Sequence, residues 1–423
     1  MKAAAAKVEG FTPYQKFVVA VLSFLQFTII LDFMIMSPLG AVLMPALNIT
    51  PSQFGFVVSA YAFSAGIAGF LAAGFADRFD RKRLLLFFYT GFILGTLFCG
   101  LAPSYPILLA ARIITGLFGG VIGSIVFAIT TDLFPVEKRG RVMGLLQTAF
   151  AASQVLGLPV GLYFSNHWGW HAPFLMIVGL GALVGIVIFQ RLKPIDEHLK
   201  AQAAREAQGH IRTSAVSHLW KTIALPRYQF AFAATALLST GGFMLMPFGS
   251  AFTVNNLGIP LDQLPIIYLV TGLCSIVMGP LIGRLADSFG YFRTFFFGTL
   301  VTIVMVSIYT HLGRTPLPWV ILVNALMFVG IFSRMIPSQA LVSTIPDPAS
   351  RGAFMSVSSS VQQISGGFAS VLAGLIVSFD AGGALQHFEL VGYTVTLTAI
   401  ICLGMIYRIH RNSVATQRLA QAA

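Results

Sequence analysis

Charged residues are scarce in this sequence. Asp, Glu, Lys and Arg make up only 9% of the 423 residues, and hydrophobic residues make up 57%, against usual shares of about 25% and about 45–50%. Such a chain has too few polar residues to cover the surface of a soluble domain. Apolar windows of roughly 20 residues recur along its whole length, and a helix of that size crosses the hydrocarbon core of a bilayer. The composition therefore excludes the ordinary soluble classes.

Cysteine is rare, and motifs for metal or nucleotide binding are missing. The three cysteines (Cys99, Cys274 and Cys402) lie far apart in apolar segments, where a thiol packs as a small apolar group. The eight histidines lie in loops, helix ends or tails without the spacing of metal ligands. No glycine-rich loop is followed by the lysine that cradles nucleotide phosphates. We therefore expect no metal, no cofactor, no enzymatic reaction and no direct use of ATP.

Twelve apolar segments are long enough to cross a membrane as helices. They form two sets of six, namely residues 14–46, 53–74, 84–102, 106–133, 141–165 and 172–192, and residues 228–255, 264–285, 294–312, 318–340, 352–378 and 389–409. The longest polar stretch separates the two sets. We predict an all-α integral membrane protein with an N-terminal six-helix bundle (residues 1–192), a cytoplasmic linker (residues 193–227) and a C-terminal six-helix bundle (residues 228–423).

The net charge of +12 is distributed unevenly along the chain. All of the 26 Lys and Arg residues except Arg112, Arg314 and Arg334 lie in the two tails or in alternate loops. Basic loops remain on the cytoplasmic side of a membrane. The pattern predicts a multi-pass protein of the inner (plasma) membrane with both termini and the linker in the cytoplasm. The positive charge thus orients the chain, and we do not expect it to bind nucleic acid.

Two loop sequences of the first half recur in the second half. AGFADRFDRKR (residues 73–83) resembles GRLADSFGYFR (residues 283–293), which matches Asp77 with Asp287. FPVEKRGRVMG (residues 134–144) resembles IPDPASRGAFMS (residues 345–356) at nearly the same separation. A duplicated six-helix unit is a transporter architecture. We interpret the chain as two related bundles.

With these motifs the sequence resembles the major facilitator superfamily over essentially its full length. The signature of that family after its second helix resembles G-x-L-A-D-R-x-G-R-K, and residues 73–82 here read AGFADRFDRK. Ala73 and Asp80 stand where the family usually has glycine, so Asp80 adds a charge where a flexible residue is expected. The resemblance implies twelve helices in two six-helix domains that transport a solute.

Three further features resemble one branch of that family, the drug:proton antiporters. Arg112 in LLAARIITGLFGG (residues 108–120) matches the arginine of the fourth helix, and Asp32 precedes Pro38 in the first helix. GLPVG (residues 157–161) resembles a reduced form of the fifth-helix antiporter motif, with Gly157, Pro159 and Gly161. The resemblance implies proton-coupled efflux of a small organic or amphipathic compound.

The resemblance also implies a gate at the cytoplasmic mouth. Charges there would pair when the protein opens outward and separate when it opens inward. The alternative is that they are solvated loop charges. The implied gate residues are Asp77, Arg78, Arg81, Asp132 and Asp287.

Asp32, Arg112 and Arg334 are the only charged residues deep within the predicted spans. Each would cost about 2.5–3.5 kcal/mol at the centre of a lipid-facing helix, so we expect all three to face the protein interior. A movement that changed the hydration of Asp32, or its distance from an arginine, would make it bind or release a proton. Asp32 and Arg112 are therefore the candidate proton-coupling residues. The alternative is a fixed ion pair that only joins the first and fourth helices.

Six further residues are candidates for contact with the solute. Glutamines that recur at helical spacing offer a donor and an acceptor to a polar solute, although they could equally bond neighbouring helices. The seventh span contains glycines and a proline near its middle, which indicates a broken helix at the binding region. Arg334 could attract an anionic group or pair within a gate. The candidates are Gln147, Gln154, Phe243, Met246, Arg334 and Gln363.

These observations together predict a secondary transporter that alternates between inward-open and outward-open states. Proton-coupled efflux of a small molecule by a monomer is the leading hypothesis. A proton symporter or a uniporter for a sugar, organic anion or lipid is one alternative. A membrane receptor or scaffold that does not transport is another.

Overall fold

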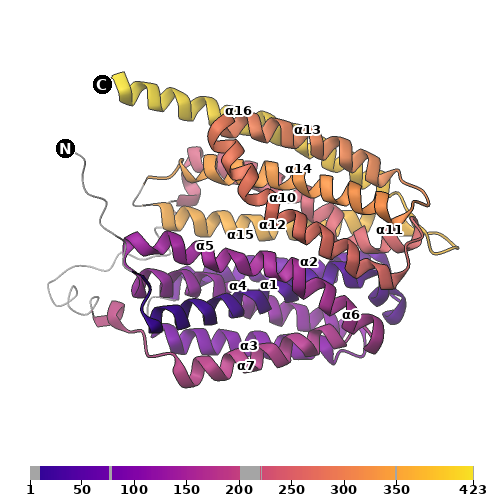
Figure 1. Cartoon of the computed structure of the whole chain (residues 1–423), viewed down its shortest axis with the longest axis horizontal. Helices are drawn as coiled ribbons and strands as arrows, with labels where there is room; N and C mark the ends of the chain where they lie inside the picture. Colours follow the sequence, from indigo (N-terminus) through magenta and orange to yellow (C-terminus); the bar gives the residue numbers. More distant parts are fainter. Residues whose placement is uncertain (1–9, 76–78, 201–219, 221, 348–349, 423) are drawn as a thin grey trace.

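The computed structural model describes residues 10–75, 79–200, 220, 222–347 and 350–422, and most of them lie in long helices (Figure 1). The predicted gate residues Asp77 and Arg78 lie outside the described residues. The first six spans are α1 (Pro13–Leu47), α2 (Pro51–Phe75), α3 (Arg81–Gly100), α4 (Tyr105–Leu133), α5 (Val136–Ala152) with α6 (Leu158–Trp168), and α7 (Ala172–Arg191).

The second set of spans follows after the linker. A short hairpin of two strands, β1 (Ser378–Phe379) and β2 (Leu385–Gln386), joins the last two helices. The spans are α10 (Pro226–Leu245) with α11 (Gly249–Asn255), α12 (Leu264–Phe289), α13 (Tyr291–Thr310), α14 (Leu317–Ser343), α15 (Arg351–Ile376) and α16 (Phe388–Ala422).

Eleven helical segments in the described part of the chain are long and apolar enough to cross a membrane. The remaining long helix is α15, whose sequence RGAFMSVSSSVQQISGGFASVLAGLI carries many serines and two glutamines. These polar residues lower its hydropathy without shortening it. The predicted set of twelve spans therefore agrees with the observed helices. In Figure 1 the second six spans gather in one layer above the first six.

Local sequence signals explain where the spans begin, end and break. Thr12 caps α1 in a capping box with Gln15, which satisfies two backbone donors at the helix start. The seventh span breaks, as predicted, into a short 3-10 segment at Met246–Phe248, because Pro247 cannot donate a backbone hydrogen bond. The fifth span contains a π-helical turn at Ser153–Gly157, just before Pro159.

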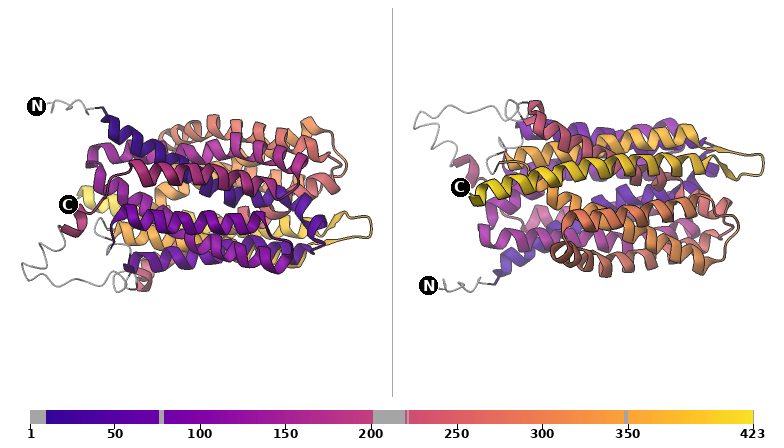
Figure 2. Two further views of the ribbon diagram at one scale, coloured as in Figure 1. Left: turned by 90° about the horizontal axis from the view of Figure 1, so that it is seen from below. Right: turned by 90° about the horizontal axis from the view of Figure 1, so that it is seen from above.

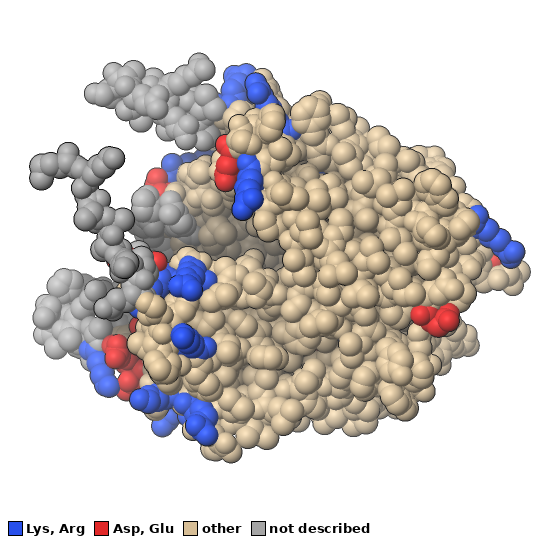
Figure 3. Space-filling view, in the orientation of Figure 1, with Lys and Arg blue, Asp and Glu red and all other residues tan. Residues whose placement is uncertain are grey.

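The start of α1 and the end of α16 lie at the same end of the molecule (Figures 1 and 2). We call it the basic end, because Lys and Arg side chains gather there (Figure 3). It includes Arg81–Arg83, Lys138–Arg141, the start of the linker and the Arg408–Arg411 turn of α16. The two layers of helices run from this end to the opposite end.

The apolar core changes character along the molecule. Toward the opposite end, one cluster of buried side chains spans both bundles and includes Phe54 of α2 and Phe248 beside α11, whose ring centroids lie 6.1 Å apart. Toward the basic end, the buried side chains form two separate clusters, one confined to the first bundle and one to the second. The cluster that both bundles share thus lies toward the opposite end, and Phe70 of α2 also packs against the cluster of the second bundle.

Close packing of α2 on α4 depends on glycine. A Cβ atom added to Gly120 would lie 2.3 Å from the carbonyl oxygen of Ala65, and one added to Gly116 would lie 2.0 Å from Ser64 Oγ. Small residues let helix backbones approach in this way within membranes. Gly123 belongs to the same glycine-rich run, yet an added Cβ would meet nothing within 4 Å.

Gly120→Ala should lower the free energy of unfolding by about 1–3 kcal/mol, because α2 and α4 would have to separate to accommodate the methyl group. Thermal melting of the purified protein in detergent measures the change. Gly123→Ala is the matched control, and its melting temperature should stay constant or rise, since alanine favours a helix over glycine. An equal loss in both variants would contradict the packing role of Gly120.

Candidate functional site

The centre of the first bundle contains a buried ion pair. Nη1 of Arg112 (α4) donates to Oδ2 of Asp32 (α1) at 2.8 Å. The hydroxyl of Thr96 (α3) donates to the other carboxylate oxygen at 3.1 Å. Asp32 and Arg112 are both 0% exposed. The structure thus brings together the two residues that the sequence singled out, and both oxygens of the acid have a donor.

Separating Asp32 from Arg112 costs a large free energy. Removing one partner of a buried ion pair leaves an uncompensated charge, which typically costs about 3–5 kcal/mol. A proton on Asp32 would neutralise the carboxylate and leave Arg112 without its counter-ion. The arrangement can therefore convert the gain or loss of one proton into a change in how α1 and α4 hold together.

Aromatic rings connect the ion pair to the second bundle. The guanidinium carbon of Arg112 lies 4.6 Å from the centroid of the Tyr61 ring in α2, within the range of a cation–π contact. Tyr61 packs on Phe33 of α1 with centroids 5.5 Å apart, and Phe33 packs on Phe243 of α10 at 5.7 Å. We call these three rings the aromatic bridge.

Sequence reasoning missed two members of the aromatic bridge, Tyr61 and Phe33. Neither residue type is unusual in an apolar helix, and their contact with Arg112 and Phe243 depends on how four helices cross. Phe243 was a candidate contact for the solute, and the structure places it between the bundles. A Cβ atom added to Gly366 of α15 would lie 2.6 Å from the ring of Phe243.

The fifth span packs on α1 beside the ion pair through its motif glycines. A Cβ added to Gly157 would lie 2.7 Å from Leu31, and one added to Gly161 would lie 2.7 Å from Ile35. The amide of Leu158 donates to Ser153 five residues back, and Pro159, which follows, has no amide hydrogen. The motif therefore places a π-helical turn and two glycines against the segment that carries Asp32.

The seven-residue spacing of Gln154 and Gly161 does not put these two residues on one helix face. Gln147 is exposed, whereas Gln154 is buried with no hydrogen-bond partner for Oε1. The backbone carbonyl carbon of Gln154 would lie 3.1 Å from a Cβ added to Gly272 of α12, while Gly161 faces α1. The π-helical turn at Ser153–Gly157 adds a residue between Gln154 and Gly161, so their seven-residue spacing no longer returns to the same face.

The remaining candidate solute contacts do not converge on one point. Gln363 packs beside Gly66 of α2. A Cβ atom added to Gly66 would lie 3.4 Å from the Cβ atom of Gln363. The carbonyl oxygen of Met246 accepts a hydrogen bond from the Ser37 hydroxyl. These contacts join the bundles, as side chains in an interface do.

Arg334 lies inside the second bundle, 4% exposed. Its guanidinium carbon is 5.8 Å from the Phe295 ring, and its Nη1 would lie 3.8 Å from a Cβ added to Gly241 of α10. Its Nε has no hydrogen-bond partner. In the described part of the chain, no carboxylate lies within 4.0 Å of this arginine. It is a buried charge without a counter-ion.

The molecule is hollowed between the two layers of helices at the basic end (Figure 3). At the opposite end the bundles touch through polar as well as apolar groups. Ser250 donates to the backbone oxygen of Ser37 at 2.8 Å, and the Asn166 amide donates to the backbone oxygen of Leu261 at 3.0 Å. The structure is thus closed at the opposite end and open at the basic end.

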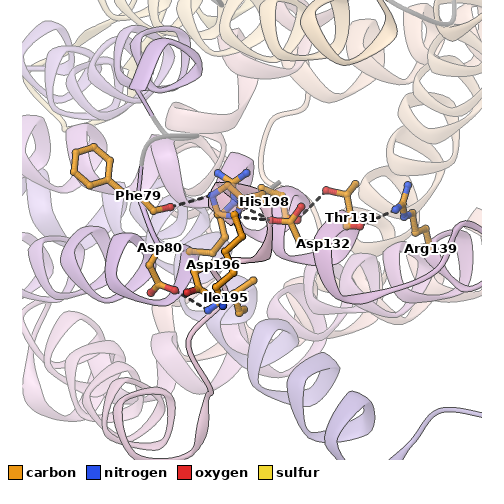
Figure 4. A network of polar contacts seen from close by, with 11 residues as sticks. Phe79, Asp80, Thr131, Asp132, Arg139, Ile195, Asp196 and His198 are labelled. Carbon is orange, nitrogen blue, oxygen red and sulfur yellow. Dashed lines mark hydrogen bonds and ion pairs between the residues drawn. The ribbon is translucent and has the colours of Figure 1, made fainter. Parts of the chain in front are cut away.

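Polar contacts at the basic end tie the start of the linker to the first bundle (Figure 4). Nε of Arg81 pairs with Oδ2 of Asp132 at 3.0 Å. Nδ1 of His198 lies 3.5 Å from the same oxygen, and its Nε2 lies 3.2 Å from the carbonyl oxygen of Phe79. We call residues 193–200, at the start of the linker, the strap.

The backbone conformation and contacts of Asp80 explain why aspartate stands here where the family signature has glycine. Its backbone φ is −56°, which any residue adopts, and its side chain caps α3 by accepting from the amide of Arg83. The second carboxylate oxygen accepts from the amide of Ile195 in the strap at 2.6 Å. Arg81 in turn donates its backbone amide to the Ile195 carbonyl oxygen at 3.1 Å. Asp80 therefore holds the strap in place.

The gate differs from the expectation in two ways. Arg81 and Asp132 are paired although the basic end is open, because both belong to the first bundle and do not part when the bundles separate. Asp287 is exposed on α12 and accepts from the Tyr291 hydroxyl at 2.8 Å. Among the described residues it has no basic partner within 4.0 Å. The structure does not bring Asp287 to Arg81 and Asp132.

Known proteins resemble this chain along most of its length. The family model described as Major Facilitator Superfamily matches residues 22–370 and, in a second match, residues 231–418. The uncharacterized MFS-type transporter YceJ of Bacillus subtilis (strain 168) is 28% identical over 379 residues, which cover 88% of this chain and 91% of that protein. Multidrug resistance protein 3 of the same organism is 36% identical over 149 residues, or 35% of this chain and 29% of that protein.

Solved structures share the fold. A bacterial homolog to the human lysosomal transporter Spinster, in an inward-facing and unoccupied conformation, superposes with a TM-score of 0.72 at 16% identity, covering 95% of this chain and 98% of that chain. A D-xylose-proton symporter has a TM-score of 0.72 at 18% identity, with 92% and 97% covered. The predicted all-α fold of two six-helix bundles is confirmed. The chain belongs to the Major Facilitator Superfamily and is a multi-pass membrane protein that carries small molecules by secondary transport with alternating access, not an enzyme.

Proposed function

We propose that this transporter exports a small organic or amphipathic compound in exchange for protons, and that Asp32 binds the coupling proton. The observation that carries the proposal is the fully buried ion pair of Asp32 with Arg112. Asp32 is the only acidic residue deep within a span, and intramembrane acids mark proton pathways. The similarity to a protein named for multidrug resistance supports export of organic compounds.

The distribution of charge supports an orientation. Because Lys and Arg gather at the basic end (Figure 3), the positive-inside rule places that end in the cytoplasm, with both termini and the strap. We place the protein in the plasma membrane as a monomer, since both bundles and the hollow between them come from one chain. In this orientation the structure is inward-open.

An inward-open structure with a closed ion pair corresponds to the state after proton release. Asp32, once deprotonated, is held by Arg112 and Thr96. After the bundles rock to the outward-open state, a proton from outside neutralises Asp32 and frees Arg112. The aromatic bridge then carries the change to Phe243 in the second bundle. Each state thus has its own protonation, as antiport requires.

A second candidate function follows from Arg334. A buried guanidinium that lacks a carboxylate partner attracts an acidic group on a solute. This favours an organic anion as the solute, carried by symport or uniport. Dependence of transport on an imposed pH gradient separates the two candidates, because only exchange against protons drives a solute uphill toward the more acidic side.

Asp32→Asn should abolish gradient-driven transport, because the amide cannot take up a proton and return it. Proteoliposomes with an imposed pH gradient and a solute found by a ligand-stability screen measure the rate. We expect a loss of at least about 100-fold in uphill transport, typical of removing an essential proton-transfer group. Asp262→Asn, which makes the same change at an exposed acid of the opposite end, should transport normally. Undiminished uphill transport by Asp32→Asn would refute the assignment.

Tyr61→Leu should uncouple the ion pair from the second bundle, because leucine has no π face for Arg112. A cation–π contact contributes about 0.5–2 kcal/mol, so we expect uphill transport to fall about 2- to 30-fold while downhill exchange of the solute persists. Tyr61→Phe keeps the ring and is the control. Equal behaviour of the leucine and phenylalanine variants would show that the ring of Tyr61 has no part in coupling.

Asp132→Asn should loosen the strap, since it removes the charge that faces Arg81 and His198. Hydrogen exchange of the backbone amides of residues 193–200 measures the effect, and we expect it to accelerate about 5- to 30-fold, which corresponds to roughly 1–2 kcal/mol. Glu197→Gln, an exposed acid of the same segment, is the control. Unchanged exchange in Asp132→Asn would mean that Asp80 alone holds the strap.

A further inference from the structure

The second bundle has a hollow of its own at the basic end, between the first turns of α10 and the Arg408–Asn412 turn of α16. Its volume is about 400 Å³, and it is lined by Phe230, Arg408, Arg411 and Asn412. The buried ion pair and the strap both belong to the first bundle. The residues that line the hollow are therefore distinct from the ion pair, the aromatic bridge and the strap. We call it the α10–α16 site.

The α10–α16 site carries two positive charges and no negative one. Arg408 and Arg411 are three residues apart on α16 and so lie on one face of that helix. The guanidinium carbon of Arg408 lies 5.9 Å from the centroid of the Phe230 ring. Within the described part of the chain, no carboxylate lies within 4.0 Å of either arginine. Two adjacent guanidinium groups suit a phosphate, which accepts their forked donors.

An apolar strip leads from these arginines along the same face of α16 into the membrane-spanning segment. Leu397, Ile401 and Gly404 precede Arg408 at helical spacing, and Leu397 and Ile401 are 59% and 47% exposed. A Cβ added to Gly404 would meet nothing within 4 Å. The strip therefore has a recess at Gly404, next to the arginines. The segment Phe388–Asn412 has the composition of a membrane span, which places the arginines at its polar boundary.

We propose that the α10–α16 site binds the phosphate of an anionic phospholipid, whose acyl chain lies along Leu397 and Ile401. A free phosphate ion would meet the same two guanidinium groups, but it would leave the apolar strip uncovered. A zwitterionic phospholipid would cover the strip, but its ammonium group would oppose the two arginines. Basic hollows between spanning helices on the cytoplasmic side suit such anionic headgroups.

Native mass spectrometry of the full-length protein in detergent, titrated with dioleoyl-phosphatidylglycerol, tests the proposal. We expect the Arg408→Gln/Arg411→Gln variant to bind this lipid about 30-fold more weakly than the wild type. Dioleoyl-phosphatidylcholine should bind the wild type about as weakly as the anionic lipid binds the variant. Inorganic phosphate at millimolar concentration should not displace the anionic lipid.

Arg284→Gln/Arg293→Gln is the matched control, because it removes the same charge from two exposed arginines of the second bundle. This control should bind phosphatidylglycerol like the wild type. Equal weakening in both double variants would overturn the site in favour of general surface charge, and displacement by phosphate would overturn the lipid as its occupant. Arg411→Gln alone, at an exposed position, should weaken binding about 5-fold and keeps the test decisive if the double variant does not fold.

Discussion

The fold of the first bundle depends on keeping one carboxylate and one guanidinium together away from water. Either charge alone would be too costly inside a bilayer, so α1 and α4 must meet where Asp32 and Arg112 lie. The surrounding helices serve this contact: α3 supplies Thr96 to the free carboxylate oxygen, and the fifth span sets glycines against Leu31 and Ile35. Gly116 and Gly120 bring α2 close enough to α4 for Tyr61 to cover the guanidinium.

The way in which the two bundles join suits a rocking motion. Their common apolar cluster lies toward the end opposite the termini, whereas each bundle has its own cluster toward the basic end. Contacts at the closed end combine this apolar cluster with polar groups, such as those of Ser37 with Met246 and Ser250. Opening the closed end would separate side chains of the shared cluster, whereas the buried clusters toward the basic end each belong to one bundle. The aromatic bridge crosses this interface beside the ion pair, where a change of charge can bias the exchange.

The sequence predicted what composition and residue type determine, and it failed where helix geometry decides. Twelve spans, the break at Pro247 and the meeting of Asp32 with Arg112 follow from hydropathy, proline chemistry and the cost of buried charge. The seven-residue spacing of Gln154 and Gly161 does not give a shared face because a π-helical turn lies between them, and periodicity assumes a regular helix. Tyr61 and His198 were missed because their partners lie on other segments. No spacing within one helix reports such contacts.

Asp80 shows how a departure from a family signature can carry information. Glycine is retained in a turn when the backbone needs a positive φ, but Asp80 has a φ of −56°, so this turn does not need glycine. The carboxylate instead joins the start of α3 to Ile195 of the strap, next to the pairing of Arg81 and His198 with Asp132. The strap is continuous in sequence with the linker that leads to α10. Through Asp80 and Asp132 the strap therefore contacts both the start of α3 and the end of α4, the helix that carries Arg112.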